Sequence, residues 1–161
     1  MPTGIGYDIH RISSNGEMVL GGIIIASLPA FDAESDGDVI IHAVIDALLG
    51  ATNNILENNN DISDFFKANN TMKEKNSEKV LLKVLSTINS KKKLSIVNID
   101  VVVIAAKPKI KDYQEEIITN LTNILNLDKK QITIKGKSNN GIGEIGRGEA
   151  VSCIAIIETK D

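Results

Sequence analysis

The segment Ile96-Val97-Asn98-Ile99-Asp100-Val101-Val102-Val103-Ile104-Ala105-Ala106 is rich in β-branched residues. Such residues favour the pleated backbone of a strand, so we expect a central strand of a β-sheet here. Lys107-Pro108-Lys109 interrupts the pattern. A helix is expected to begin near Asp112, because Glu115 three residues on completes a capping-box pattern.

The residues after this strand predict one helix and two further strands. Apolar residues recur at helical spacing on one face, at Ile117, Leu121, Ile124 and Leu125. Residues 131–135 and 149–158 have strand patterns and flank a glycine-rich loop.

The residues before the central strand predict a hairpin and two helices. Strands are expected at 4–12 and 18–25, with the turn formers Ser13-Ser14-Asn15-Gly16 between them. A largely buried helix is expected at 39–50, capped by Ser35 or Asp36. Residues 53–76 contain eight asparagines and predict a long polar loop. A helix from Ser77 would follow, with its apolar face at Val80, Leu81, Val84, Leu85 and Ile88.

The order β, β, α, α, β, α, β, β predicts an α+β fold, a mixed β-sheet with helices packed on one face. A chain of 161 residues suits a single domain, which we place at residues 1–161.

Composition excludes several classes of function. A net charge of -3 argues against nucleic-acid binding, which needs a basic surface. The sequence has neither an apolar run long enough for a membrane span nor a secretion signal, so we expect a cytoplasmic protein without membrane contact. Cys153 is the single cysteine, so no internal disulfide can form, and its apolar neighbours predict a buried thiol.

Both histidines lie near carboxylates. Residues i and i+2 of a strand share a face, so Asp8 and His10 should project together. In the helix, His42 has Asp38 and Asp46 four residues to either side. Asp8, His10 and His42 supply the three N and O donors of a zinc site with an open fourth position. Asp38 or Asp46 would orient the His42 ring. A hydrogen-bonded Asp–His pair beside a core histidine is the alternative.

The glycine-rich loop Gly141-Ile142-Gly143-Glu144-Ile145-Gly146 matches G-x-G-x-x-G. A dinucleotide site needs a helix next and an acidic residue about 20 positions on, whereas a strand is expected here. We therefore interpret these glycines as tight turns, or as close backbone approach to a neighbouring chain or an anion.

Five motifs in order along the chain indicate a family. They are Gly6-Tyr7-Asp8-Ile9-His10, Ser35-Asp36-Gly37-Asp38 with His42, Asp46-Ala47-Leu48-Leu49-Gly50, Ala105-Ala106-Lys107-Pro108-Lys109 and Gly146-Arg147-Gly148-Glu149. Over nearly its whole length the sequence resembles the 2-C-methyl-D-erythritol 2,4-cyclodiphosphate synthase family. The resemblance implies a homotrimer with active sites between adjacent subunits. It also implies a phosphorus–oxygen lyase of the non-mevalonate isoprenoid pathway.

In that family the substrate is 4-diphosphocytidyl-2-C-methyl-D-erythritol 2-phosphate. Its 2-phosphate attacks the β-phosphate of its own diphosphate, which releases CMP and closes the cyclic diphosphate. Such phosphoryl transfer gains mostly from alignment and from cations that absorb charge. The resemblance implies zinc at Asp8, His10 and His42, and magnesium or manganese bridging the substrate phosphates.

The resemblance also assigns substrate contacts. Ser35 and Ser138 would bind phosphate, Asp61 the erythritol hydroxyls, and residues 105–111 the cytidine diphosphate of a neighbouring subunit. Arg147 would lie near the trimer axis, where a central cavity could hold an isoprenoid diphosphate. The full set expected to contact substrate is Asp8, His10, Glu34, Ser35, Asp61, Ser63, Phe66, Ala105, Lys109, Lys137, Ser138, Asn140, Glu144 and Arg147, with Ser138 and Glu34 in catalytic roles.

Some positions depart from the family pattern. Glu34 stands where the family has His, Asn140 where it has the second-metal Glu, and Ser63 where it has Gly. A carboxylate beside phosphates needs an intervening cation, so we hypothesise that Glu34 partly replaces the magnesium ligand lost at Asn140. Lys137 would add positive charge near the nucleotide. The alternatives are a zinc phosphoesterase that activates water, and an impaired trimer that binds nucleotide or isoprenoid diphosphate without turnover.

Overall fold

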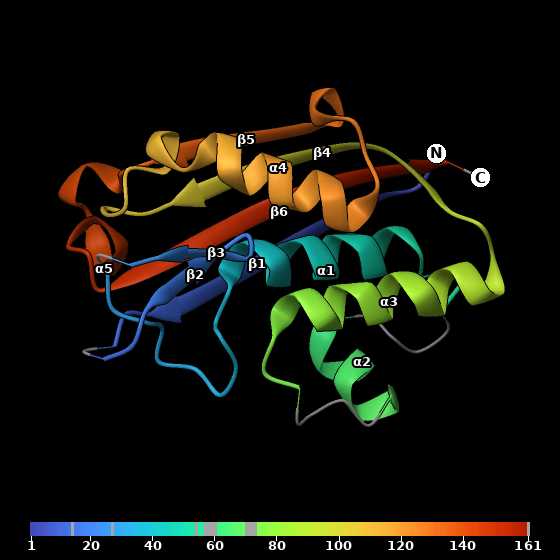
Figure 1. The fold of residues 1–161 in the computed structure, drawn as a ribbon, viewed down its shortest axis with the longest axis horizontal. Coiled ribbons are helices and arrows are strands. Elements are labelled where there is room, and N and C mark those ends of the chain that lie inside the picture. The colour runs from blue at the N-terminus through green and yellow to red at the C-terminus, as the bar shows by residue number, and fades with distance from the viewer. Residues whose placement is uncertain (14, 27, 54, 57–60, 70–73, 161) are drawn as a thin grey trace.

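A four-stranded sheet forms the centre of the molecule (Figure 1). The computed structural model describes residues 1–13, 15–26, 28–53, 55–56, 61–69 and 74–160. The strand order is β1 (Thr3–Arg11), β6 (Ala150–Lys160), β4 (Ser95–Ile104) and β5 (Ile132–Lys137). β4 runs parallel to β5, and the other two pairs are antiparallel. The sheet is therefore mixed, and the β-branched segment that begins at Ile96 forms an inner strand, as predicted.

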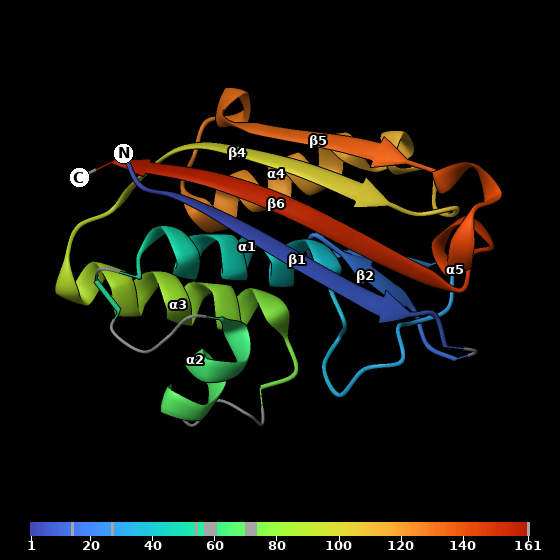
Figure 2. The same ribbon diagram turned by 180° about the vertical axis from the view of Figure 1, so that it is seen from behind.

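Three helices lie on one side of this sheet, two of them against its strands and the third against another helix. Figures 1 and 2 show α1 (Val39–Ala51), α3 (Ser77–Lys91) and α4 (Gln114–Leu125) on the same side. No helix among the described residues lies over the opposite face of β1 and β6 (Figure 2). The buried apolar residues of sheet and helices form one core. The α+β architecture with helices on one face is thus confirmed.

The predicted hairpin between residues 4–12 and 18–25 is wrong. β1 pairs with β6, from Thr3 opposite Glu158 to Arg11 opposite Ala150. Residues 18–25 are two short antiparallel strands, β2 (Met18–Leu20) and β3 (Ile23–Ile25). Gly21 and Gly22 divide them with φ of 59° and 77°, values that suit glycine and make a tight turn.

The predicted loop at 53–76 contains a helix. α2 (Ile62–Asn69) lies within it, and Phe65 on its inner side is fully buried. Asp61 starts this helix, since its Oδ1 accepts the Asp64 N–H at 2.9 Å. The asparagine-rich composition of this segment led us to expect a loop in place of this short amphipathic helix. Residues 54, 57–60 and 70–73 lie outside the described part, so the loop prediction is not tested there.

Two predicted helix caps are corrected. Asp38, not Ser35 or Asp36, caps α1 by accepting the Ile40 and Ile41 N–H groups. The capping box of Asp112 and Glu115 does not form, because Asp112 ends a separate turn, η1 (Ile110–Asp112), and Tyr113 precedes α4. The remaining short elements are η2 (Lys129–Gln131), η3 (Asn139–Gly141) and α5 (Gly143–Gly146).

Candidate active site

Asp8, His10 and His42 form a compact cluster between β1 and α1. Asp8 and His10 project from the inner face of β1, as their spacing predicted, and His42 lies in the first turns of α1. Asp8 Oδ2 lies 3.1 Å from His10 Nε2 and 2.9 Å from His42 Nδ1, and the two nitrogen atoms are 3.4 Å apart. One carboxylate oxygen and two imidazole nitrogens thus face a common point.

Two glycines let β1 approach α1 this closely. A Cβ atom on Gly6 would lie 2.7 Å from the Ala47 amide nitrogen and closer still to the Ala43 carbonyl oxygen. A Cβ on Gly4 would meet the backbone of Ala47 and Ala51 in the same way. The strand therefore packs on the backbone of the helix, which sets the distance between Asp8 and His42.

The charges in this cluster stabilise one another. Burial alone would raise the pKa of Asp8, but the hydrogen bonds and charges of His10 and His42 outweigh burial and lower it to about 2. Burial alone would lower the pKa of His42, but the Asp8 carboxylate outweighs burial and raises it. Asp8 is therefore anionic at neutral pH, and a metal ion would take the place of the proton between the three groups.

The three atoms fit a zinc ion. Two ligands that are each about 2.0–2.1 Å from a tetrahedral zinc are about 3.3 Å apart. The observed separations of 2.9, 3.1 and 3.4 Å bracket that value. The side chains of Asp8 and His10 retain 22% and 23% of their exposure, so a fourth position stays open on this side. Asp8, His10 and His42 therefore suit a divalent metal with one position for substrate.

Neither carboxylate expected to orient His42 contacts its ring. Asp38 is fully buried and accepts N–H groups from Gly21, Gly22, Ile40 and Ile41. It thereby ties the β2–β3 turn to the start of α1, and burial raises the pKa of Asp38 to about 6. Asp46 Oδ1 accepts the Ile62 N–H at 2.8 Å. Both carboxylates accept hydrogen bonds from backbone N–H groups, so the prediction that one of them orients the His42 ring was wrong.

The ring of His42 instead meets Ser77, which sequence reasoning had treated only as a helix start. Ser77 Oγ lies 2.9 Å from His42 Nε2 and also donates to Asp36 Oδ1. Ser77 and His42 are 35 positions apart, and no local pattern connects them. Asp36 belongs to one of the five motifs, but the sequence carries no signal that its side chain turns toward α3.

A small cavity opens beside the metal cluster. It has a volume of roughly 280 Å³ and is lined by His10, Ala33, Glu34, Ser35, Phe66 and Glu74. The structure thus brings Glu34, Ser35 and Phe66, three of the residues expected to contact substrate, together with His10. Asp61 and Ser63 are exposed residues around the start of α2 and do not line this cavity.

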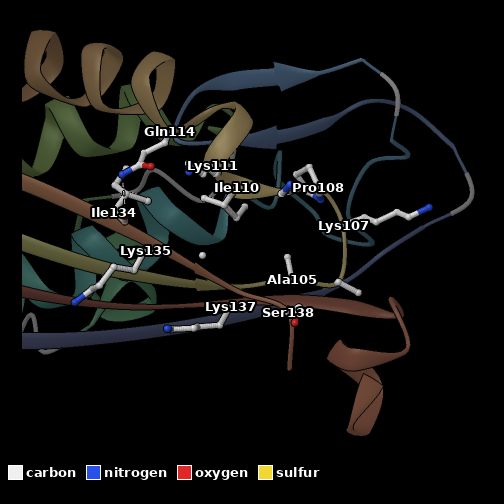
Figure 3. A pocket seen from close by; sticks show the side chains of 13 residues that line it. Ala105, Lys107, Pro108, Ile110, Lys111, Gln114, Ile134, Lys135, Lys137 and Ser138 are labelled. Carbon is white, nitrogen blue, oxygen red and sulfur yellow. Dashed lines mark hydrogen bonds between the residues drawn. The ribbon is translucent and has the colours of Figure 1, made fainter. Parts of the chain in front are cut away.

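A larger cavity lies at the ends of β4 and β5 (Figure 3). Its volume is roughly 690 Å³, and Ala105, Lys109, Lys137 and Ser138 line it, as does Gln114. Five lysines surround it, namely Lys107, Lys109, Lys111, Lys135 and Lys137, and no acidic side chain is among its lining residues. This concentration of positive charge suits a phosphorylated ligand.

The remaining predicted residues lie around the end of β5 and the turns after it. Ser138 Oγ lies 3.3 Å from Asn140 Oδ1. Arg147 pairs with Glu149 at 2.6 Å and Glu144 at 3.6 Å. Glu144 and Glu149 line a third cavity of roughly 340 Å³ with Ile9 and Arg11. The G-x-G-x-x-G loop forms η3 and α5 and leads into β6, not into the helix of a dinucleotide site.

Cys153 plays no part in these cavities. It is fully buried in β6, and burial raises the pKa of its thiol above the usual range. The prediction of a buried thiol is confirmed.

Comparison with known proteins identifies the family of this chain. The model of the YgbB family matches residues 1–160. The chain belongs to the YgbB family. The resemblance that the five motifs indicated is therefore confirmed.

Several curated relatives of this YgbB-family chain are 2-C-methyl-D-erythritol 2,4-cyclodiphosphate synthases. The 2-C-methyl-D-erythritol 2,4-cyclodiphosphate synthase of Treponema denticola is 42% identical, over 96% of this chain and 93% of that protein. The synthase of Caldicellulosiruptor bescii is 37% identical, over 96% and 95%.

Solved structures of the same kind share the fold. The IspF of Plasmodium falciparum, solved as a CDP complex, is 36% identical with a TM-score of 0.81, over 97% of this chain and 93% of that one. The bifunctional IspDF of Campylobacter jejuni is 30% identical with a TM-score of 0.87; it matches 99% of this YgbB chain, which spans 42% of that longer protein.

Proposed function

We propose that this protein converts 4-diphosphocytidyl-2-C-methyl-D-erythritol 2-phosphate to 2-C-methyl-D-erythritol 2,4-cyclodiphosphate and CMP, as a phosphorus–oxygen lyase of isoprenoid biosynthesis. The observation that carries this proposal is the Asp8, His10 and His42 cluster, which has the spacing of a divalent-metal site and an open side toward a cavity. The name of the relatives gives the product, the family resemblance implies the substrate, and the two cavities offer places for its two halves.

The chain's own residues mainly align a substrate that carries its own nucleophile. The Ser35 hydroxyl and, in the larger cavity, the Ser138 hydroxyl would donate to phosphate oxygens. Lys109 and Lys137 would neutralise the diphosphate of the cytidine half. A divalent ion held by the Asp8, His10 and His42 cluster would supply Lewis-acid chemistry at the β-phosphate, and the second ion would be magnesium or manganese. Alignment of this kind lowers the barrier because the reacting groups are already in one molecule.

A homotrimer with active sites between subunits is part of this proposal. The large and small cavities share no lining residue, so one chain presents them as separate half-sites. On the sheet face away from the helices, Ile5, Tyr7, Ile9 and Ile156 are 68%, 53%, 43% and 43% exposed. An apolar face of this kind favours burial against another copy. Arg147, Glu144 and Glu149 would then surround a central cavity able to take an isoprenoid diphosphate.

The test is CMP release by the zinc-loaded protein with magnesium and the cytidine substrate. Phosphorus NMR should show the cyclic diphosphate. A linear hydrolysis product would favour a zinc phosphoesterase, and ligand binding without CMP would favour an impaired trimer. Either result from a correctly folded, zinc-loaded protein would refute the synthase proposal.

Lys137→Met is expected to raise the dissociation constant for CDP by about ten-fold, or about 1.4 kcal/mol, because it removes from the larger cavity a lysine that has no ion-pair partner among the described residues. The double variant Asp100→Asn/Lys135→Met is the control. It removes another lining lysine together with its partner, whose Oδ1 lies 2.6 Å from Lys135 Nζ, so net charge is unchanged. Calorimetry should detect less than about a two-fold change for this pair. Equal effects of the two variants would contradict the assigned role of Lys137.

Glu34→Gln is expected to raise the magnesium concentration for half-maximal CMP release about ten-fold, since enzymes hold magnesium with one or two carboxylates besides substrate phosphates. Glu74→Gln is the matched control in the same cavity. The Glu74 carboxylate already accepts the Asn76 N–H at 3.0 Å and lies 3.9 Å from Lys79 Nζ. An unchanged magnesium dependence in Glu34→Gln would show that Glu34 does not replace the magnesium ligand that is missing at Asn140.

A further inference from the structure

The side of the His42 ring away from Asp8 faces a buried hydrogen-bond network. His42 Nδ1 lies 2.9 Å from Asp8 Oδ2, so Nε2 is directed the other way, where Ser77 Oγ lies 2.9 Å from it. Ser77 is 1% exposed and His42 is 8% exposed. Water therefore has little access to replace the hydroxyl at this position.

Asp36 determines the direction of the Ser77 hydroxyl. The Ser77 N–H donates to Asp36 Oδ2 at 2.9 Å, and the Ser77 hydroxyl donates to Asp36 Oδ1. Asp36 is itself held in place, because its N–H donates to the Lys75 carbonyl at 2.9 Å. The segment before α1 and the start of α3 are thus joined by three hydrogen bonds of Asp36, two to its carboxylate and one from its backbone N–H.

The donors and acceptors of this network allow only one arrangement of protons. An ionised carboxylate only accepts, and a serine hydroxyl has a single hydrogen to donate. Since that hydrogen is used toward Asp36, Ser77 Oγ can only accept from His42. The His42 Nε2 atom must then carry a proton, so Nδ1 is the atom that shares a proton with Asp8 in the metal-free protein and offers its lone pair when a metal ion replaces that proton.

We propose that Ser77, held by Asp36, is the positioning residue that fixes the His42 tautomer and ring orientation for metal binding. Metal-binding histidines usually donate their other ring N–H to a carboxylate or carbonyl group. Here the Ser77 hydroxyl lies between the two groups, because it accepts from the His42 ring and donates to the Asp36 carboxylate. This inference deepens the proposed function, and it concerns metal binding before any substrate is present.

Ser77→Ala is expected to weaken cobalt binding by about 10- to 100-fold, the range for loss of an outer hydrogen-bond partner of a ligand. Cobalt is the probe because its visible absorption also reports ligand geometry. The control is Ser152→Ala, which removes another serine that is 1% exposed but whose Oγ has no partner among the described residues. Ser152→Ala should retain the affinity and the spectrum.

Asp36→Asn tests the proton arrangement without changing size. The amide oxygen would accept the Ser77 N–H, so the amide N–H would face Ser77 Oγ and turn its hydroxyl toward His42 Nε2. His42 Nδ1 would then carry the proton, which competes with the metal, and cobalt affinity should fall at least as far as in Ser77→Ala.

Unfolding of the metal-free variants separates positioning from a purely structural role. Cobalt affinity that falls well beyond any loss of metal-free stability supports the proposal. Unchanged cobalt affinity in Ser77→Ala and Asp36→Asn would overturn it, and so would losses that follow metal-free stability alone. Failure of the protein to release CMP would count against the proposed reaction and leave these binding results intact.

Discussion

Asp8→Asn is expected to reduce the metal content of the purified protein from near one ion per chain to less than about a tenth, because it removes the only anionic donor of the cluster. CMP release should fall by about 10³-fold, since Lewis-acid stabilisation is worth several kcal/mol and each 1.36 kcal/mol is tenfold in rate. The side chain keeps its size, so the fold should persist. Metal analysis and a CMP assay measure the two losses.

A second carboxylate near the cluster provides the control. Asp46 on α1 has its pKa raised to about 6 by burial, and its Oδ1 accepts the Ile62 N–H. An amide can accept that hydrogen bond equally well, so Asp46→Asn should keep the full metal content. If Asp8→Asn also bound one ion per chain, the metal site would have to be assigned to other residues.

Gly6→Ala is expected to lower the free energy of unfolding by about 3 kcal/mol, the upper part of the usual range for overpacking. The new methyl group would collide with backbone atoms of Ala43 and Ala47, which cannot turn aside as a flexible side chain can. β1 must therefore move away from α1 and carry Asp8 and His10 with it. Urea denaturation of the metal-free protein measures the destabilisation, and a cobalt titration should show weaker binding.

Gly50→Ala distinguishes this effect from a general intolerance of alanine at the same interface. A Cβ on Gly50 would lie 3.6 Å from Gly4 Cα, an ordinary contact. Because alanine is a better helix former, Gly50→Ala should be neutral or stabilise the protein by up to about 1 kcal/mol. Similar losses in both variants would mean that the close packing at Gly6 does not determine the geometry of the site.

The Asp8, His10 and His42 cluster shows which features of the site local sequence patterns can predict. A period of two placed Asp8 and His10 on one face of a strand, and the donor chemistry of His42 completed the set. The same reasoning failed for Asp38 and Asp46, because helical spacing places them near His42 without deciding where their oxygens point. Those oxygens instead accept hydrogen bonds from the backbone N–H groups of Gly21 and Ile62, which need a partner.

In the fold, too, local patterns predicted some features and not others. The β-branched run in β4 and the apolar periods of α3 and α4 are local, so their element types were predictable. The partner of β1 was not, because β6 lies more than 130 positions away and the turn formers at 13–16 suggested a nearby strand. The positive φ angles at Gly21 and Gly22 divided the residues that would have provided that strand.

The sequence by itself determined the family, the three side chains proposed to bind the metal and the kinds of elements that carry them, because residue chemistry and periodicity are local properties. Only the tertiary structure decided how close β1 lies to α1, and that Ser77 and Asp36 meet the far side of the His42 ring. Those contacts join residues 35 and 41 positions apart. Their geometry depends on how the helices pack together on the sheet, and no local pattern specifies that packing.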